Sequence, residues 1–204
     1  MSTPVQAELS TKERLIEAAI SIIEAEGEVA LRVDRVVEIA GFTKPVLYHH
    51  FTDREGIIAA AQAERFRRTL DLGMDDALES VSAVSTPQDF LEVMRGLLRQ
   101  FAAPAGQDRR RFRIEVLGSA VSRPALMKSI VEAGRTHAAK FEMPMRIAAD
   151  RGWLQTDVPI RDFSQWWTGL MLSRYLFEMD PDGFDVESWD AVTDAVMRSM
   201  IRGI

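Results

Sequence analysis

The fold is decided by the stretch VDRVVEIAGFTKPVLYHHFTDR, residues 33–54. Its first part places apolar residues at helical spacing, and Gly41 follows them as a residue that ends helices. Only Phe42 and Thr43 then precede a second helical pattern, in which Thr43 is a capping residue and Pro45 suits the first turn. The apolar positions are Val33, Val36, Val37 and Ala40 before the turn and Leu47 and Phe51 after it. This arrangement predicts a helix-turn-helix.

Further helices are predicted on both sides of this stretch. A capping box at residues 10–13 opens a helix that Gly27 ends, and residues 1–9 before it read as a loose, flexible tail. A second capping box at residues 52–55 predicts a longer helix through about Leu78. The N-terminal part of the chain is therefore expected to be a small bundle around the helix-turn-helix.

The rest of the chain also shows helical periodicity and few signs of strands. A loop is expected from Ser80 to Ser85. Helices are expected over about residues 87–101, 107–119, 124–151 and 160–179, and from residue 185 to the end. The sequence thus predicts an all-α protein.

Composition narrows the possible functions. The chain has 204 residues, 47% of them hydrophobic and 27% charged, which is typical of a folded globular protein. It contains no cysteine, which excludes disulfides, thiol catalysis and Cys-based zinc sites. No secretory signal or membrane-spanning run is recognised, so we expect a cytoplasmic location. The net charge is −6, and the first 54 residues hold 6 Lys+Arg against 9 Asp+Glu, so DNA binding would require one specific surface.

The second helix of the helix-turn-helix is suited to contact DNA. Its outer side carries Lys44, Tyr48 and His49, and so short a helix fits a major groove about 12 Å wide. Backbone N–H groups in its first turn, with Arg54 nearby, suit phosphate oxygens. The alternative is an ordinary helical corner with a solvated face, and the pattern alone leaves both interpretations open.

The same residues resemble the DNA-binding domain of the TetR family of transcriptional regulators. Residues 40–43, AGFT, match the family's turn, and residues 47–51, LYHHF, match its recognition helix. Arg54 stands where the family has a lysine. The resemblance covers residues 10–56, and it implies a DNA-binding domain over residues 10–54 followed by a helical ligand-binding and dimerisation domain over residues 55–204.

The resemblance implies a role for individual positions. Lys44, Pro45 and Val46 fall where the family touches base edges, and Lys44 is the candidate for a guanine contact. The expected phosphate contacts are Thr43, Tyr48, His49 and Arg54. Two positions depart from the family: Arg32 is a further candidate for a phosphate contact, while Asp34 would repel phosphate unless it pairs with Arg32 or Arg35.

The C-terminal region is rich in Met and aromatic residues, which can line an adaptable apolar pocket or simply pack a core. The resemblance implies an effector pocket here. The candidate lining residues are Met94, Leu97, Phe101, Phe112, Val116, Met127, Ile130, His137, Phe141 and Trp167. Possible polar groups for a ligand are Arg113, Glu115, His137 and Arg174.

The last two helices carry apolar stripes that one helical pair cannot fully bury. A two-fold partner presenting the same pair would cover them in a four-helix bundle, which is also the dimer that the resemblance implies. The candidate interface residues are Trp166, Leu170, Arg174, Trp189, Val192, Val196 and Met200.

Two other patterns in the sequence could carry a binding site. Adjacent His49 and His50 point about 100° apart on a helix, so a metal site is not expected. The arginines at 109–111 and 113 could bind nucleic acid or an anionic partner or transmit a signal between domains, but a solvated helix face is the favoured interpretation.

We therefore expect a homodimeric DNA-binding regulator rather than an enzyme. It acts as a repressor and leaves a near-palindromic operator when a small, mainly apolar effector binds. The alternative is a constitutive or protein-partnered DNA-binding regulator whose C-terminal domain serves only dimerisation. No cofactor, metal or membrane contact is expected.

Overall fold

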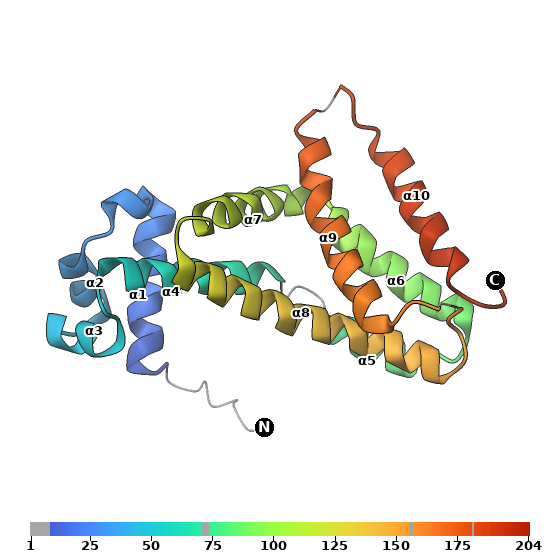
Figure 1. The fold of residues 1–204 in the computed structure, drawn as a ribbon, viewed down its shortest axis with the longest axis horizontal. Coiled ribbons are helices and arrows are strands. Elements are labelled where there is room, and N and C mark those ends of the chain that lie inside the picture. The colour runs from blue at the N-terminus through green and yellow to red at the C-terminus, as the bar shows by residue number, and fades with distance from the viewer. Residues whose placement is uncertain (1–8, 71–73, 156, 181) are drawn as a thin grey trace, which may run out of the picture. The chain divides into compact units, whose positions relative to one another are not determined.

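The computed structural model describes residues 9–70, 74–155, 157–180 and 182–204, and these residues are predominantly helical (Figure 1). Within those ranges the extended structure consists of one isolated bridge between Leu154 and Ile201. The all-α fold class is confirmed. The tail expected over residues 1–9 lies outside the described residues except for Leu9.

The chain divides into two compact units. The first comprises residues 1–67 and 119–131, and the second comprises residues 68–118 and 132–204. The division falls within three helices, α4 (Arg54–Leu70), α7 (Gln107–Ala120) and α8 (Pro124–Asp150), each of which contributes to both units.

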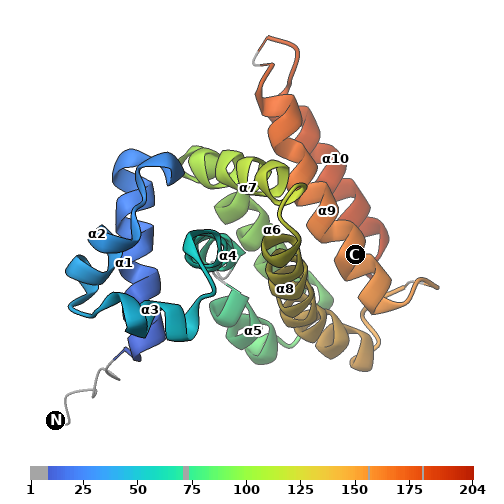
Figure 2. The ribbon, with the colours of Figure 1, turned by 60° about the vertical axis from the view of Figure 1, so that its left-hand side comes forward.

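The first unit is built around the predicted helix-turn-helix. Helix α1 (Thr11–Glu26) and the short helix η1 (Glu28–Ala30) precede α2 (Val33–Ala40) and α3 (Lys44–His50), as Figure 2 shows. The capping box at the start of α1 is confirmed, with Ser10 accepting from the Glu13 backbone and Glu13 accepting from the Ser10 backbone. The apolar faces predicted from the sequence meet in one core, whose fully buried members include Leu15, Leu31, Val36, Leu47, Ile57 and Ile58.

The turn between α2 and α3 depends on Gly41. This residue has φ 72°, in the left-handed region, and the Phe42 N–H then donates to the Val37 carbonyl at 2.8 Å. The Arg14 guanidinium donates to the Ala40 carbonyl at 2.8 Å and lies over the Phe42 ring. Helix α1 therefore holds the end of α2 in the position from which α3 begins.

The second unit has its own apolar core. It contains α5 (Met74–Ala83), α6 (Pro87–Ala102), η2 (Pro104–Gly106), α9 (Ile160–Glu178) and α10 (Val186–Ser199). Phe90, Leu91, Met94, Phe141 and Trp167 are among the buried residues of this core. Arg95 of α6 forms a two-point ion pair with Asp194 of α10 at 2.6 and 2.8 Å, which fixes these helices against each other.

Two boundaries differ from the sequence prediction in the middle of the chain. The helix expected from residue 52 through Leu78 ends as α4 at Leu70, and α5 begins separately at Met74 with two aspartates in its first turn, where the helix dipole favours them. The loop expected from Ser80 to Ser85 is helical as far as Ala83. The Ser80 and Ser82 hydroxyls donate to carbonyls four residues earlier, so both serines are accommodated within the helix.

Two helix ends also differ. Helix α4 begins at Arg54, and the cap is the Asp53 carboxylate, which accepts from the Gly56 N–H at 2.8 Å, rather than the expected Thr52 box. Helix α10 stops at Ser199 instead of reaching the end of the chain. The residues after it pair with the segment following α8, through a bond from the Gln155 N–H to the Met200 carbonyl at 2.7 Å.

Replacing Gly41 with alanine tests the turn. We expect Gly41→Ala to lower the free energy of unfolding by about 1–2 kcal/mol, because a Cβ is strained in the left-handed region. Urea unfolding followed by circular dichroism measures this change. Gly118→Ala is the control, because Gly118 lies in α7 with open space around it and alanine favours helix there. A Gly41→Ala variant as stable as the native protein would contradict this role of the turn.

Candidate nucleic-acid interface and ligand cavity

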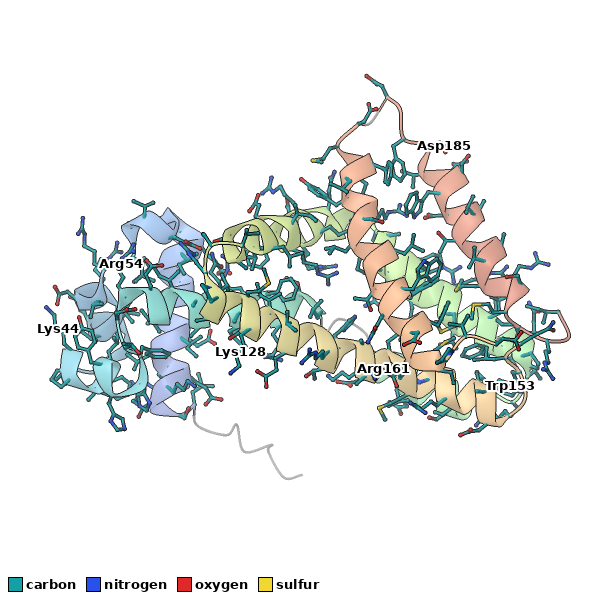
Figure 3. All side chains as sticks on the ribbon, viewed as in Figure 1. Lys44, Arg54, Lys128, Trp153, Arg161 and Asp185 are labelled. Carbon is teal, nitrogen blue, oxygen red and sulfur yellow. The ribbon has the colours of Figure 1, made fainter. Side chains whose placement is uncertain are left out.

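Helix α3 presents a polar face outward and an anchoring face inward. Leu47 is fully buried and the following Phe51 is buried beside it, while Lys44, Tyr48 and His49 are exposed. Thr43 occupies the cap position and Pro45 the first turn, as the sequence predicts, but the Thr43 side chain makes no capping hydrogen bond to the described residues. Both residues are exposed, and Val46 is half-buried. Figure 3 shows Lys44 at the outer edge of this unit. Five of the residues that the sequence assigns to DNA, Lys44, Pro45, Val46, Tyr48 and His49, thus lie on this one helix, with Thr43 at its cap.

Lys44 is paired with the acidic residue that departs from the family pattern. Its Nζ lies 2.6 Å from an Asp34 carboxylate oxygen, and both side chains are more than half exposed. The hydrogen bond and the charge of Asp34 raise the pKa of Lys44 above its usual value. The partner of Asp34 is thus neither of the two arginines considered from the sequence. Arg35 pairs with both oxygens of Glu26 at 2.8 Å, and Asp34 pairs with Lys44.

Arg54 is tied to the backbone that precedes α2. Its Nε donates to the Leu31 carbonyl at 2.8 Å and its Nη2 to the Glu28 carbonyl at 2.7 Å, while Nη1 pairs with Glu55 at 3.0 Å. These acceptors lie in and after η1, so the guanidinium joins the start of α4 to the segment before the helix-turn-helix. Arg32, by contrast, is exposed at the cap position of α2.

Glu28 also joins separate segments of the first unit, and we call its contacts with Gln62 and Arg123 the Glu28 junction. Its carboxylate accepts from Gln62 Nε2 at 2.5 Å and pairs with Arg123, from the turn between α7 and α8, at 2.7 Å. Burial raises the pKa of Glu28, but the hydrogen bonds from Arg123 and Gln62 outweigh it, and the net pKa lies below its usual value. No local sequence pattern marks Glu28 or Arg123, because the two residues are too far apart in the chain for their pairing to be predicted from spacing.

The second unit contains a cavity of about 80 Å³. Six of the predicted lining residues surround it: Met94, Leu97, Phe101, His137, Phe141 and Trp167. Leu70, Leu98, Gln100, Gly106 and Thr168 complete the lining together with Arg109, Arg110 and Arg113. The walls are therefore mainly apolar, with a concentration of guanidinium groups from α7.

Four predicted lining residues do not border this cavity. Phe112 and Val116 lie on α7 but point elsewhere, because neighbouring helical positions face about 100° apart and Val116 is buried in packing. Met127 and Ile130 belong to the first unit. Apolar periodicity identified an inward helix face in each case, but it does not distinguish a cavity wall from a packed core.

The arginine run of α7 is not the solvated face that was favoured. Arg111 is exposed and pairs with Glu115 along the outer side of the helix, but Arg110 and Arg113 are only 3% and 7% exposed. The amphipathic pattern failed here because guanidinium groups are buried when they find acceptors on other elements. Glu115, proposed as a polar group for a ligand, is on the exposed side of the helix and does not border the cavity.

Helices α9 and α10 leave several apolar side chains exposed. Trp166 is 49% and Val192 65% exposed, and Leu170, Trp189, Val196 and Met200 are half-buried. Leu176, Phe177 and Val186 extend the exposed apolar surface beyond the predicted set. Arg174 differs from the others, since it is buried and pairs with Glu178 at 2.8 Å and Asp190 at 2.5 Å, joining α9 to α10 within one chain.

Other kinds of site find little support in the described part of the chain. His49 and His50 are exposed neighbours with ring centres 5.1 Å apart. No cluster of three acidic or histidine side chains suited to a metal occurs among the described residues. None of the helices in these ranges is both long enough and apolar enough to cross a membrane.

Comparison with known proteins agrees with this geometry. The sequence model of bacterial regulatory proteins of the tetR family matches residues 15–61, which include the helix-turn-helix. The transcriptional repressor AcnR of Corynebacterium glutamicum is 24% identical over 155 residues, covering 74% of this chain and 72% of the relative. The HTH-type regulator TtgW of Pseudomonas putida, itself uncharacterized, is 30% identical over 96 residues, covering 41% of this chain and 72% of that protein.

A solved structure shows the same fold. A protein from Mesorhizobium loti described as a TetR-family transcriptional regulator matches with a TM-score of 0.64 and 18% identity over 93% of this chain and 94% of that chain. The fold and the helix-turn-helix surface define a DNA-binding transcription regulator. The chain belongs to the TetR family, whose members are transcription factors and not enzymes.

Replacing Glu28 with glutamine tests the junction at the start of the DNA-binding unit. Because hydrogen bonds to a charged group contribute about 1.5–3 kcal/mol, Glu28→Gln is expected to lower the free energy of unfolding by that order at pH 7. The pKa of Glu28 is lowered in the fold, so its contribution is present above the ordinary value of 4.5 and is lost as pH falls through the folded pKa.

The difference between variant and native protein should therefore shrink below about pH 4.5, as urea titrations at several pH values would show. Glu26→Gln is the matched control, because Glu26 pairs with Arg35 on an exposed surface and should matter much less. A Glu28→Gln effect that is the same at every pH would contradict the assigned role of the charge.

Proposed function

We propose that this protein is a homodimeric, ligand-responsive repressor that leaves a near-palindromic operator when a small effector binds. The observation that carries the proposal is the exposed face of α3, which displays Lys44, Tyr48 and His49 on a helix anchored by buried Leu47. The repressor AcnR among its relatives supports the direction of regulation. We assign DNA binding to residues 10–54 and ligand binding and dimerisation to residues 55–204.

On DNA, Lys44, Pro45 and Val46 read base edges, with Lys44 donating to guanine. Thr43, Tyr48, His49 and Arg32 contact phosphates around this helix. Arg54 stands where the family has a phosphate-binding lysine, but its donors are held by the carbonyls of Glu28 and Leu31. We therefore assign to Arg54 the positioning of the helix-turn-helix. Its positive charge still attracts phosphates, but the guanidinium does not donate to them directly.

Asp34 makes the DNA contact of Lys44 selective for a guanine edge over phosphates and other bases. In the free protein the ammonium group is paired with the Asp34 carboxylate, and approaching phosphates meet a neutral pair instead of a free cation. A guanine edge offers two acceptors that replace the carboxylate, whereas an incorrect base leaves the ion pair to be broken without compensation. Since the pair is exposed, exchanging it is not costly at the correct site.

The cavity of the second unit is the proposed effector site. A cavity of about 80 Å³ with mainly apolar walls favours a ligand-responsive protein over a constitutive regulator with a filled core. Helix α7 lines this cavity and continues into the first unit, where Arg123, in the turn after the helix, pairs with Glu28 of the same unit. A ligand that shifts α7 would act on this junction, and operator DNA must then weaken ligand binding by the same factor.

Dimerisation uses the exposed apolar surface of α9 and α10. Trp166 and Val192 are exposed members of this proposed surface, which also includes half-buried Leu170, Trp189, Val196 and Met200. A two-fold partner would remove these side chains from water and place two recognition helices about 34 Å apart, one turn of DNA. Arg174 supports the surface from within, because it joins α9 to α10 of one chain.

Operator binding across a salt series tests the proposed function. With DNA from the region upstream of its own coding sequence, we expect tight binding that weakens steeply with salt, since phosphate contacts release counterions. The double variant Lys44→Ala, Tyr48→Ala should lose at least tenfold in affinity by fluorescence anisotropy while keeping its helical spectrum and dimer, because both side chains are exposed.

Asp34→Asn provides a matched variant of opposite sign. It frees Lys44 and removes a negative charge near DNA, so binding to unrelated DNA should strengthen and the ratio of operator to unrelated affinity should fall. No specific site in the upstream region or in a selection from random DNA would contradict the regulator proposal.

A charge on the α9–α10 surface tests the dimer. We expect Val192→Asp to shift the protein toward monomer and to weaken operator binding at least tenfold, because one chain then holds only one recognition helix. Light scattering after size-exclusion chromatography measures the mass. Val121→Asp, at an exposed valine outside these two helices, is the control. A Val192→Asp protein that remains fully dimeric would place the interface elsewhere.

A further inference from the structure

The cavity of the second unit has a cationic wall formed by the start of α7. Arg109, Arg110 and Arg113 all border it. Two of these guanidinium groups lie close to Gly106, where an added Cβ would lie 2.8 Å from an Arg110 nitrogen and 3.2 Å from an Arg109 nitrogen. Glycine at this position therefore leaves the space that these side chains occupy.

Arg110 is fully compensated by groups of the protein. Its Nε and Nη2 each donate to Glu178 at 2.9 Å, and its Nη1 donates to the Phe101 carbonyl at 2.6 Å. Glu178 also accepts from Arg174, whose other partner is Asp190. The two arginines and two carboxylates of this network balance in charge, so it needs no ligand.

Arg113 lacks such compensation. It is 7% exposed, and its two hydrogen bonds go to the Thr69 hydroxyl at 3.0 Å and to the Thr69 carbonyl, both neutral acceptors. Its guanidinium carbon lies 5.2 Å from the centre of the Phe101 ring. Neither Arg113 nor Arg109 forms an ion pair with a carboxylate of the described residues. Burial, and then the charges of Arg109 and Arg110, lower the pKa of Arg113 to about 10, still well above neutrality.

Burying a cation without a counter-ion costs free energy. This cost is offset when a bound group supplies the opposite charge. Among the described residues, Arg113 donates to neutral oxygens of Thr69, and the charges that lower its pKa are the like charges of Arg109 and Arg110. Its Nη1 donates to none of the described residues, so one edge of the planar guanidinium remains available. Carboxylates match that edge in shape and charge.

We propose that the cavity binds a small organic monocarboxylate, whose carboxylate pairs with Arg113 beside Arg109 and whose apolar body lies against Phe101, Phe141 and Trp167. The assignment rests on the proposed function and names the chemical class of its effector. Phe141 and Trp167 are stacked with ring centres 5.9 Å apart, a flat wall that suits a ring or a short branched chain. The cavity of about 80 Å³ is larger than the minimum of about 10–15 Å³ for a single water, so it has room for a small ligand.

Titration calorimetry on the full-length protein tests the assignment. The probes are benzoate, phenylacetate and 3-phenylpropanoate, each compared with its primary amide and with the amine of the same skeleton. We expect at least one carboxylate to bind at least tenfold more tightly than its amide, and the amines to bind more weakly still. Inorganic phosphate should bind much more weakly than that carboxylate, because it lacks the apolar body.

Variants identify the residue responsible. Arg113→Met should weaken the carboxylate at least tenfold and leave the amide within twofold, and Arg109→Met should weaken the carboxylate by a smaller factor. Arg109→Met also serves if Arg113→Met fails to fold after losing its bonds to Thr69. Arg111→Met, on the exposed side of the same helix, should bind like the native protein.

The outcomes separate this assignment from the proposed function. Equal binding of carboxylate and amide, preference for the amine or for phosphate alone, or no binding of any carboxylate in the series would overturn it. Operator binding of the same preparations, followed by anisotropy, reports on the DNA-binding function separately. A protein that binds its operator but prefers the neutral amides would contradict only the anionic ligand.

Discussion

The left-handed backbone at Gly41 is the constraint on which the DNA-binding unit depends. It reverses the chain within three residues, so that buried Leu47 of α3 meets the core formed by α1 and α2. Arg14 secures the turn from α1 through the Ala40 carbonyl. Because α3 is anchored by so few apolar residues, the position of its exposed face is set mainly by this turn and by the tie from Arg54 to the segment before α2.

A charge that is buried or half-buried needs a partner of opposite charge, and the charged residues of the two units differ in whether they have one. Glu28 finds Arg123 and Gln62, and Arg110 finds Glu178, so these groups join helices distant in sequence and stabilise the fold. Within the described part of the chain, Arg113 donates only to the neutral hydroxyl and carbonyl oxygens of Thr69. The contrast is what distinguishes a structural ion pair from a candidate ligand-binding group.

Local signals in the sequence predicted much of the helical architecture. The capping box at Ser10, the helix end at Gly41 and Pro45 in the first turn of α3 were recognised correctly because each depends on neighbouring residues. The predictions failed at Ser82, which remains helical, and after Ser199, where the chain pairs with the segment beyond α8. In these places a hydrogen bond that helical periodicity does not register decided the outcome.

By itself, the sequence determined that the chain is helical, that it carries a helix-turn-helix and that Lys44 and Tyr48 face outward from it, because spacing along a helix fixes these properties. Tertiary structure alone decided that Asp34 pairs with Lys44, that Arg123 meets Glu28, and that Arg113 is buried beside a cavity while Arg111 is not. Pairing and burial of charge depend on which distant parts of the chain meet in the fold. Helical periodicity reports only on neighbouring residues, so it does not predict those contacts.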